Sequence, residues 1–88
     1  MLLLEVLPLL EMKIEASTRK HKKYVAILDN GSKIHFGDSR YGHYKDSTPL
    51  QKFKHLDHLD LKRRKSFHSR FGSPQKHSAA WFALKYLW

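Results

Sequence analysis

The dipeptide Asn30-Gly31 constrains the fold of this chain more than any other feature, because it separates two apolar runs of strand-like composition. The runs are residues 23–29, Lys-Tyr-Val-Ala-Ile-Leu-Asp, and residues 32–36, Ser-Lys-Ile-His-Phe. Asn-Gly is strongly preferred in two-residue type I′ turns, which need positive φ at both central positions. The sequence therefore predicts a β-hairpin closed by a two-residue turn.

Such a turn would also fix which side chains share a face. It places Ile27 opposite Ile34 and Val25 opposite Phe36, and we expect these four side chains to form the core face. Upstream, apolar and polar residues alternate from Met12, which indicates a further strand. The predicted strands of this three-stranded antiparallel sheet are residues 12–17, 23–29 and 32–36.

The second half of the chain is predicted to form two or three short helices, which makes the fold class α+β. A basic helix of about residues 57–71 starts at a capping aspartate, Asp57 or Asp60, and ends before a glycine. A shorter helix is expected at residues 49–55. The apolar tail, residues 78–88, begins with a serine that suits a helix cap.

Composition excludes several classes of protein. The chain has 88 residues and no cysteine, so a disulfide framework, a zinc ribbon, an iron–sulfur site and a thiol nucleophile are all impossible. Apolar residues make up 41% and aromatic residues 12%, which is too rich for a disordered basic tail. We expect one small domain over residues 12–88, suited to a reducing compartment.

Positive charge is the second constraint. The net charge is +9, and residues 19–88 carry 16 Lys or Arg against five Asp. Dense basic clusters attract polyanions such as nucleic acid, anionic lipid or an acidic protein surface. The residues predicted to contact anions are Arg19, Lys20, Lys22, Lys23, Lys62, Arg63, Arg64, Lys65 and Arg70.

Both ends of the chain are apolar. Residues 1–11 are leucine-rich, but they are too short to span a membrane and lack the basic start of a signal peptide. We interpret them as an arm that docks into a neighbouring subunit, or as an upstream extension of a reading frame that starts at Met12. The residues predicted to dock on partners are Leu3, Leu7, Leu10, Trp81, Phe82 and Trp88.

Signals of chemistry are weak. His55, Asp57, His58, Asp60 and His68 could serve a metal-dependent nuclease, but their spacing matches no strong metal motif. Capping and loop hydrogen bonds are the favoured interpretation of this set. We predict no catalytic residue, no metal site, no cofactor and no small-molecule substrate.

Four aromatic residues in the first half of the chain allow two interpretations. They could form a stacking platform for single-stranded bases, or they could fill the core of a small sheet. The core is favoured because a chain this short needs those rings inside. The four are Tyr24, Phe36, Tyr41 and Tyr44.

Several strings in this order resemble a family of small, basic, mostly uncharacterised proteins of nucleocytoplasmic large DNA viruses of algae and protists. The strings are Lys33–Tyr41, Tyr44–Asp46, His55–Asp60, Lys62–Lys65 and Ser78–Trp88. The resemblance covers residues 12–88 and departs from the family pattern at Phe67, Phe71 and Ala83-Leu84. The family has no assigned enzyme activity, so the resemblance implies no catalytic residue.

These features together predict a non-enzymatic virion structural protein, a minor capsid or capsid-associated component of a large icosahedral DNA virus. Its apolar ends would bind other capsid proteins, and its basic clusters would meet acidic protein, DNA or membrane lipid head groups. We expect it to be made in the host cytoplasm and to reside in the virion. The alternative is a soluble viral DNA- or RNA-binding accessory protein.

Overall fold

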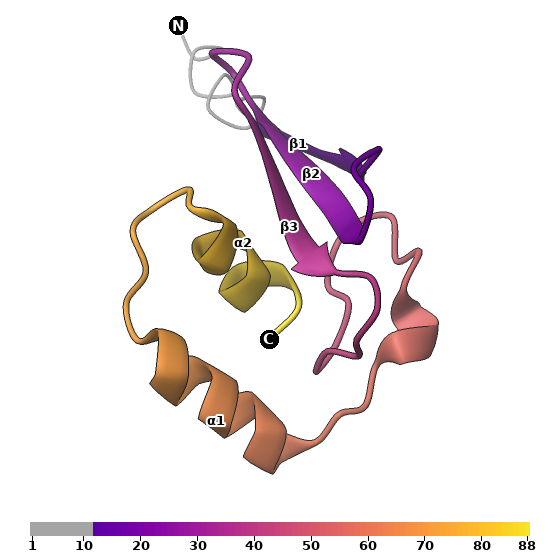
Figure 1. Cartoon of the computed structure of the whole chain (residues 1–88), viewed down its shortest axis with the longest axis vertical. Helices are drawn as coiled ribbons and strands as arrows, with labels where there is room; N and C mark the ends of the chain where they lie inside the picture. The colour runs from indigo at the N-terminus through magenta and orange to yellow at the C-terminus, as the bar shows by residue number, and fades with distance from the viewer. Residues whose placement is uncertain (1–11) are drawn as a thin grey trace, which may run out of the picture.

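The computed structural model describes residues 12–88 and has the predicted α+β arrangement, with an N-terminal antiparallel sheet followed by helices (Figure 1). The sheet has the strand order β1-β2-β3. The predicted strands and both longer helices are confirmed, with boundaries that differ by a few residues. The elements are β1 (Met12–Ala16), β2 (Lys22–Leu28), β3 (Lys33–Asp38), the 3₁₀ turn η2 (Lys54–Leu56), α1 (Leu61–Phe71) and α2 (Ala79–Tyr86).

The β2–β3 hairpin forms where Asn30-Gly31 predicts it, but its loop has three residues. The Gly31 N–H donates to the Leu28 carbonyl at 2.9 Å, and the Leu28 N–H donates to the Ser32 carbonyl at 2.9 Å. Gly31 has a φ of 89°. This is a type I turn followed by a glycine bulge. The extra loop residue shifts the strand register by one and reverses which side chains share a face.

Both predicted pairs, Ile27 with Ile34 and Val25 with Phe36, are therefore wrong. The observed pairs are Tyr24–Phe36, Val25–His35, Ala26–Ile34 and Ile27–Lys33. The core face is thus the one that the aromatic rings occupy. Tyr24 and Phe36 are fully buried, which settles their role as core residues, whereas Tyr41 is 64% exposed.

Helix α2 covers this core face. The Ser78 side chain caps α2 by accepting from the Trp81 N–H at 3.2 Å. The Phe82 ring then stacks on Phe36 with 5.5 Å between ring centroids, and Phe82 is fully buried. The prediction that Phe82 docks on a partner is therefore wrong, because the sheet needs this ring to close its own core. Trp81 and Trp88 are half-buried against the same core.

The long connection between β3 and α1 holds the end of α2 against the sheet. The Lys45 N–H donates to the Leu87 carbonyl at 3.0 Å, and the Ser47 N–H donates to the Tyr86 carbonyl at 2.8 Å. These bonds satisfy carbonyls that the end of a helix leaves free. The helix predicted at residues 49–55 is reduced to the short turn η2.

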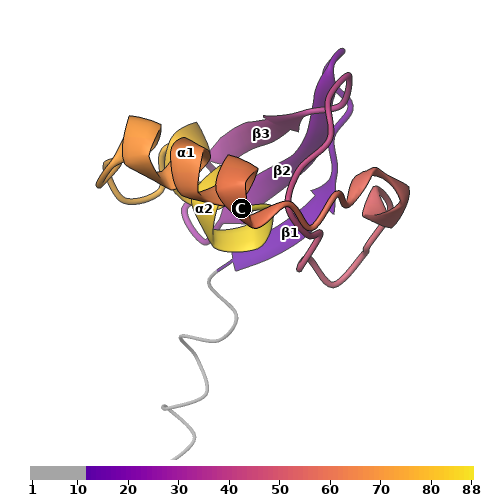
Figure 2. The same ribbon diagram turned by 90° about the horizontal axis from the view of Figure 1, so that it is seen from below.

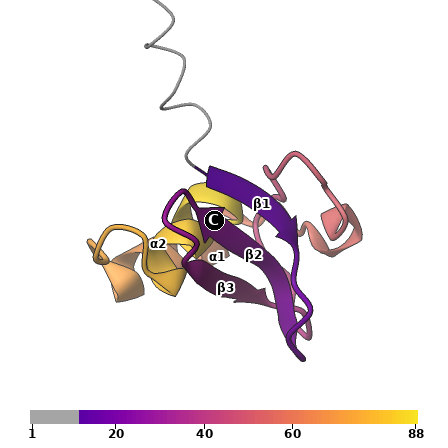
Figure 3. The same cartoon turned by 90° about the horizontal axis from the view of Figure 1, so that it is seen from above.

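Helix α1 starts at Leu61, because the carboxylate of Asp60 caps it by accepting from the backbone N–H groups of Lys62 and Arg63. No residue of α1 is buried. In Figure 1, α2 lies between the sheet and α1, and Figure 3 shows both helices behind the sheet. In residues 12–88, no helix is both long and apolar enough to cross a membrane.

Candidate anion-binding groove

A groove of about 780 Å³ lies where the ends of β2 and β3 meet α1 and α2. Its size is in the range of pockets that hold drug-sized ligands. Figure 2 shows the two helices that form its sides, with α1 in front of α2. The lining residues are Lys22, Lys23, Gly37, Asp38, Tyr41, Lys62, Arg63, Ser66, Phe67, Arg70, Phe71, Ala79, Ala80, Ala83, Leu87 and Trp88.

The apolar part of the groove comes mainly from the two helices. Helix α2 contributes three alanines, and α1 contributes the Phe67–Phe71 pair, whose ring centroids are 4.5 Å apart. Phe67 also stacks face to face on Trp88, at 4.3 Å and 5°. Small alanine side chains leave room between the helices, while the rings provide apolar surface.

Gly37 allows the sheet to approach the end of α2. Its φ is +81°, and a Cβ added there would lie 2.8 Å from Leu87 Cδ1 and 3.2 Å from two carbons of Lys23. Any side chain at this position would collide with its neighbours. The glycine therefore lets the Lys23 stem and Leu87 pack together.

The groove brings the two basic segments of the sequence together. Lys22 and Lys23 come from the first segment, and Lys62 and Arg63 come from the second, with Arg70 two turns further along α1. These cations stand around apolar surface. The arrangement suits a ligand that combines negative charge with apolar groups.

Among the described residues, Asp38 is the one acidic side chain that lines the groove, and its charge is already paired. Both oxygens of Asp38 accept from the guanidinium of Arg40, at 3.0 and 2.9 Å. These hydrogen bonds hold the pKa of Asp38 well below its usual range. The positive charge of the lining is therefore left for a ligand.

Lys23 differs from the other groove cations because it is only 2% exposed. Its Nζ donates to the Tyr41 carbonyl at 2.9 Å. Burial lowers the pKa of Lys23 to about 8, although the nearby carboxylates of Asp38, Asp46 and Asp57 favour its charged form. At neutral pH, Lys23 is therefore mostly a buried cation. The structure therefore places this predicted anion contact in a buried position at the groove, not on an open surface.

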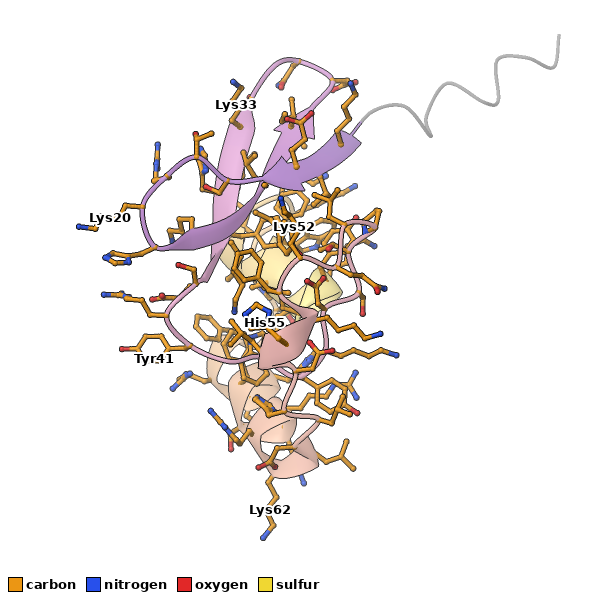
Figure 4. The ribbon with its side chains drawn as sticks, turned by 90° about the vertical axis from the view of Figure 1, so that its right-hand side faces the viewer. Lys20, Lys33, Tyr41, Lys52, His55 and Lys62 are labelled. Atoms are coloured by element: carbon orange, nitrogen blue, oxygen red, sulfur yellow. The ribbon has the colours of Figure 1, made fainter. Side chains whose placement is uncertain are left out.

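The other predicted anion contacts have different positions. Arg64 is used by the fold, because its Nε donates to the Trp88 carbonyl at 2.6 Å and its guanidinium lies over the Tyr44 ring at 4.8 Å. Arg19, Lys20 and Lys65 are exposed but do not line the groove. Figure 4 shows Lys20 and Tyr41 projecting from one side, with Lys33 and Lys62 at opposite ends of the molecule.

The predicted docking residues are also separated. Leu3, Leu7 and Leu10 lie outside the described residues. Trp88 lines the groove and holds α1 through Phe67, so the apolar tail mainly packs on its own domain.

Three residues of the histidine and aspartate set considered for metal chemistry have structural roles. Asp57 accepts from His43 Nε2 at 2.6 Å, Asp60 caps α1, and His58 Nδ1 accepts from the Asp60 N–H at 3.0 Å. Within residues 12–88, no group of three or more His, Cys, Asp or Glu side chains is placed to hold a metal ion.

His43 and Asp46 form part of a buried polar cluster that the sequence pattern did not reveal. Burial and nearby Lys23 lower the pKa of His43, although Asp57 opposes this effect. The His43–Asp57 contact is therefore a hydrogen bond from a neutral imidazole at pH 7. Both residues lie in an irregular segment, where no periodicity marks a buried position.

The fold and the groove define a small basic α+β domain with a ligand-sized apolar groove lined by cations. A family model described as "Family of unknown function (DUF5754)" matches residues 12–71, more than half of the chain. The chain therefore belongs to this family. The match covers the sheet, the long connection and α1. Neither the comparison with curated proteins nor the comparison with solved structures found a match.

Proposed function

We propose that this protein is a non-enzymatic interaction module that holds an acidic, partly apolar segment of a partner protein in the groove. The observation that supports this proposal is the pairing of apolar lining with cations from both basic segments. On the resemblance to large DNA virus proteins, we propose that the partner is another capsid protein and that the module is a minor virion component.

An amphipathic acidic peptide fits this lining better than a sugar or a nucleotide would. Its apolar side chains would lie against Phe67, the α2 alanines and Leu87, while its carboxylates would face Lys22, Lys62 and Arg63. Apolar contact gives affinity in proportion to the area removed from water, and charge complementarity gives orientation and a faster association rate.

The groove offers binding chemistry rather than catalytic chemistry. No histidine is among the lining residues described in 12–88, and the lining carboxylate, Asp38, is held by Arg40. A hydroxyl such as that of Ser66 therefore has no adjacent general base in the lining. These features support a role in association.

Nucleic-acid binding is the second candidate, because one observation favours it. Beside the groove, Lys65 lies around a shallow depression of α1 together with Lys62 and Arg70, which also line the groove, and no carboxylate in the described part of the chain pairs with these three side chains. Such a face suits phosphate contacts, whose affinity falls steeply with the logarithm of salt concentration.

The test compares three probes on the full chain by fluorescence anisotropy. They are a peptide of alternating Glu and Leu, a matched peptide of Glu and Ser, and a single-stranded DNA oligonucleotide. We expect the Glu–Leu peptide to bind tightest, with a weaker salt dependence than DNA. Equal binding of both peptides, or tighter binding of DNA, would contradict the proposal.

A pair of charge reversals locates the binding surface. Arg63→Glu with Arg70→Glu changes the groove, whereas Lys33→Glu with Lys52→Glu makes the same change in charge at exposed positions outside it. We expect the first pair to abolish Glu–Leu peptide binding and the second to leave it largely intact. Equal losses would mean that net charge alone attracts the peptide.

The proposed virion role has its own test. Purified virus particles are treated with nuclease, and this protein should remain in them at a fixed stoichiometry.

A further inference from the structure

Resting on this proposed function, we infer that Lys23 is the specificity-determining residue of the groove and that its ammonium pairs with one carboxylate of the bound segment. The exposed cations would attract acidic segments in general. Lys23 would require a carboxylate at one position, beside the apolar lining.

The position of Lys23 supports this assignment. Its stem packs at Gly37, where an added Cβ would lie 3.2 Å from Lys23 Cβ and from Lys23 Cδ, so the side chain is held along the sheet end of the groove. Its Nζ reaches the carbonyl of Tyr41, which also lines the groove. The ammonium is therefore held by packing, unlike the half-buried Lys22 and the exposed Lys62.

The neighbouring acids do not neutralise Lys23 directly. Among residues 12–88, no carboxylate lies within ion-pair distance of its Nζ. The oxygens of Asp46 accept from Tyr24 and Thr48, and Asp57 accepts from His43. These two carboxylates influence Lys23 through space while their hydrogen bonds are used elsewhere.

A buried cation of this kind discriminates among ligands. An ammonium carries three N–H donors and no acceptor, and burial of a charge is costly without a counter-charge. A ligand carboxylate would offset this cost where water is largely excluded, so the pair would be stronger than any pair at the exposed rim. An amide of the same shape would not offset it.

This inference predicts opposite effects on stability and on binding. Lys23→Met keeps an unbranched stem and removes the buried charge, so we expect a higher melting temperature and weaker peptide binding. Because Lys23→Met removes one partner of a buried charge pair, we expect its affinity for the peptide to fall on the order of 30-fold. The matched control Lys33→Met removes an exposed lysine outside the groove, and we expect less than about threefold loss.

Peptide variants locate the carboxylate. Each Glu of the Glu–Leu peptide is replaced in turn by Gln, and binding to wild type and to Lys23→Met is measured by calorimetry. One Glu→Gln change should weaken binding to wild type and have little effect on Lys23→Met, while changes at other positions should act equally on both proteins. Equal losses at every position in both proteins would overturn the inference.

A measurement on the unmodified chain covers the case in which Lys23→Met does not fold. Acetic anhydride acetylates lysines, and mass spectrometry reports the extent at each position. We expect saturating Glu–Leu peptide to slow acetylation of Lys23 and to leave Lys33 unchanged. The role of Lys23 would be refuted if the peptide did not slow acetylation of Lys23. The proposed function would stay intact if peptide binding were still lost in the Arg63→Glu, Arg70→Glu variant. Loss of all peptide binding by the wild type would refute both.

Discussion

Replacing Asp46 with asparagine should remove a large part of the stability of this domain. Asp46 is 1% exposed, and its two oxygens each accept two hydrogen bonds. Oδ1 accepts from the backbone N–H of Thr48 at 3.0 Å and from the Thr48 hydroxyl at 2.6 Å. Oδ2 accepts from the Tyr24 hydroxyl and from the Phe53 N–H, the latter at 3.2 Å. The carboxylate thus ties the long connection to the core strand β2.

The amide of asparagine cannot replace these interactions in either orientation. One of the two oxygen positions becomes an NH₂ group, which faces two donors and can accept from neither. Each hydrogen bond to a charged group contributes about 1.5–3 kcal/mol, so losing two costs about 3–6 kcal/mol. A domain of this size has a total unfolding free energy of roughly 4–13 kcal/mol. The substitution should therefore consume about half of it.

The effect should also depend on pH in a defined direction. Burial raises the pKa of Asp46, but hydrogen bonds from Thr48, Tyr24 and Phe53 outweigh burial, and the pKa lies below its ordinary value. A carboxylate with a lowered native pKa stabilises the fold above its unfolded pKa, about 3.9, and loses this effect as pH falls through the native pKa. The difference between wild type and Asp46→Asn should thus be full at pH 7 and shrink in acid below about pH 4.

Urea denaturation followed by circular dichroism measures this difference. The control is Asp38→Asn, which removes a carboxylate that also binds its neighbours but lies on the surface. We expect the control to unfold close to wild type, since exposed ion pairs contribute little. A loss below about 1 kcal/mol for Asp46→Asn at pH 7, or a loss that grows in acid, would refute the reasoning.

Two further substitutions test the packing around the groove. Gly37→Ala should lower stability by about 1–3 kcal/mol, because it adds a clash with Leu87 to the strain of a positive φ. Gly31→Ala has the same strain but nothing within 4 Å, so thermal melts should rank it as milder, and equal losses would count against the clash. Phe82→Ala should cost about 3–5 kcal/mol and broaden or abolish cooperative melting. Phe71→Ala, at a ring 41% exposed, should leave the melt nearly unchanged, and an equal effect would contradict the assigned core.

The local elements were predictable because they depend on neighbouring residues. Alternation marked the strands, and Asp60 and Ser78 capped α1 and α2 through the side-chain contacts that these residue types usually make. Asn30-Gly31 located the hairpin correctly. These signals depend on contacts between residues close in sequence, so they do not depend on how the rest of the chain packs.

The strand register was not predictable from the turn sequence, because Asn-Gly also fits a three-residue loop with the glycine as a bulge. Choosing between the loops requires knowing which face buries more apolar surface. The observed register places the Tyr24 and Phe36 rings side by side under Phe82. The ring centroids of Tyr24 and Phe36 are 6.0 Å apart, and those of Phe36 and Phe82 are 5.5 Å apart. That advantage depends on α2, which follows β3 by forty residues.

The groove was only half predictable, for a related reason. The two basic segments are evident in the sequence, but their meeting across the groove depends on where α1 is placed. A lysine in a basic run is expected to be exposed. Lys23 is instead buried, because the loop that carries Tyr41 covers its Nζ. The alternation of residues along the strand does not reveal that loop. Asp46 and His43 were missed because irregular segments carry no periodicity.

The attachment of α1 explains how a rigid core and an adaptable binding surface can coexist in so short a chain. The helix has no buried residue, and Arg64 and Phe67 join it to Trp88. Few buried contacts mean a low local opening free energy, so α1 can move more readily than α2, which is fixed by Phe82. A ligand held between α1 and the sheet end would add contacts to both sides of the groove. Binding should therefore stabilise α1 more than the sheet, and hydrogen exchange of α1 amides is where that coupling would be measured.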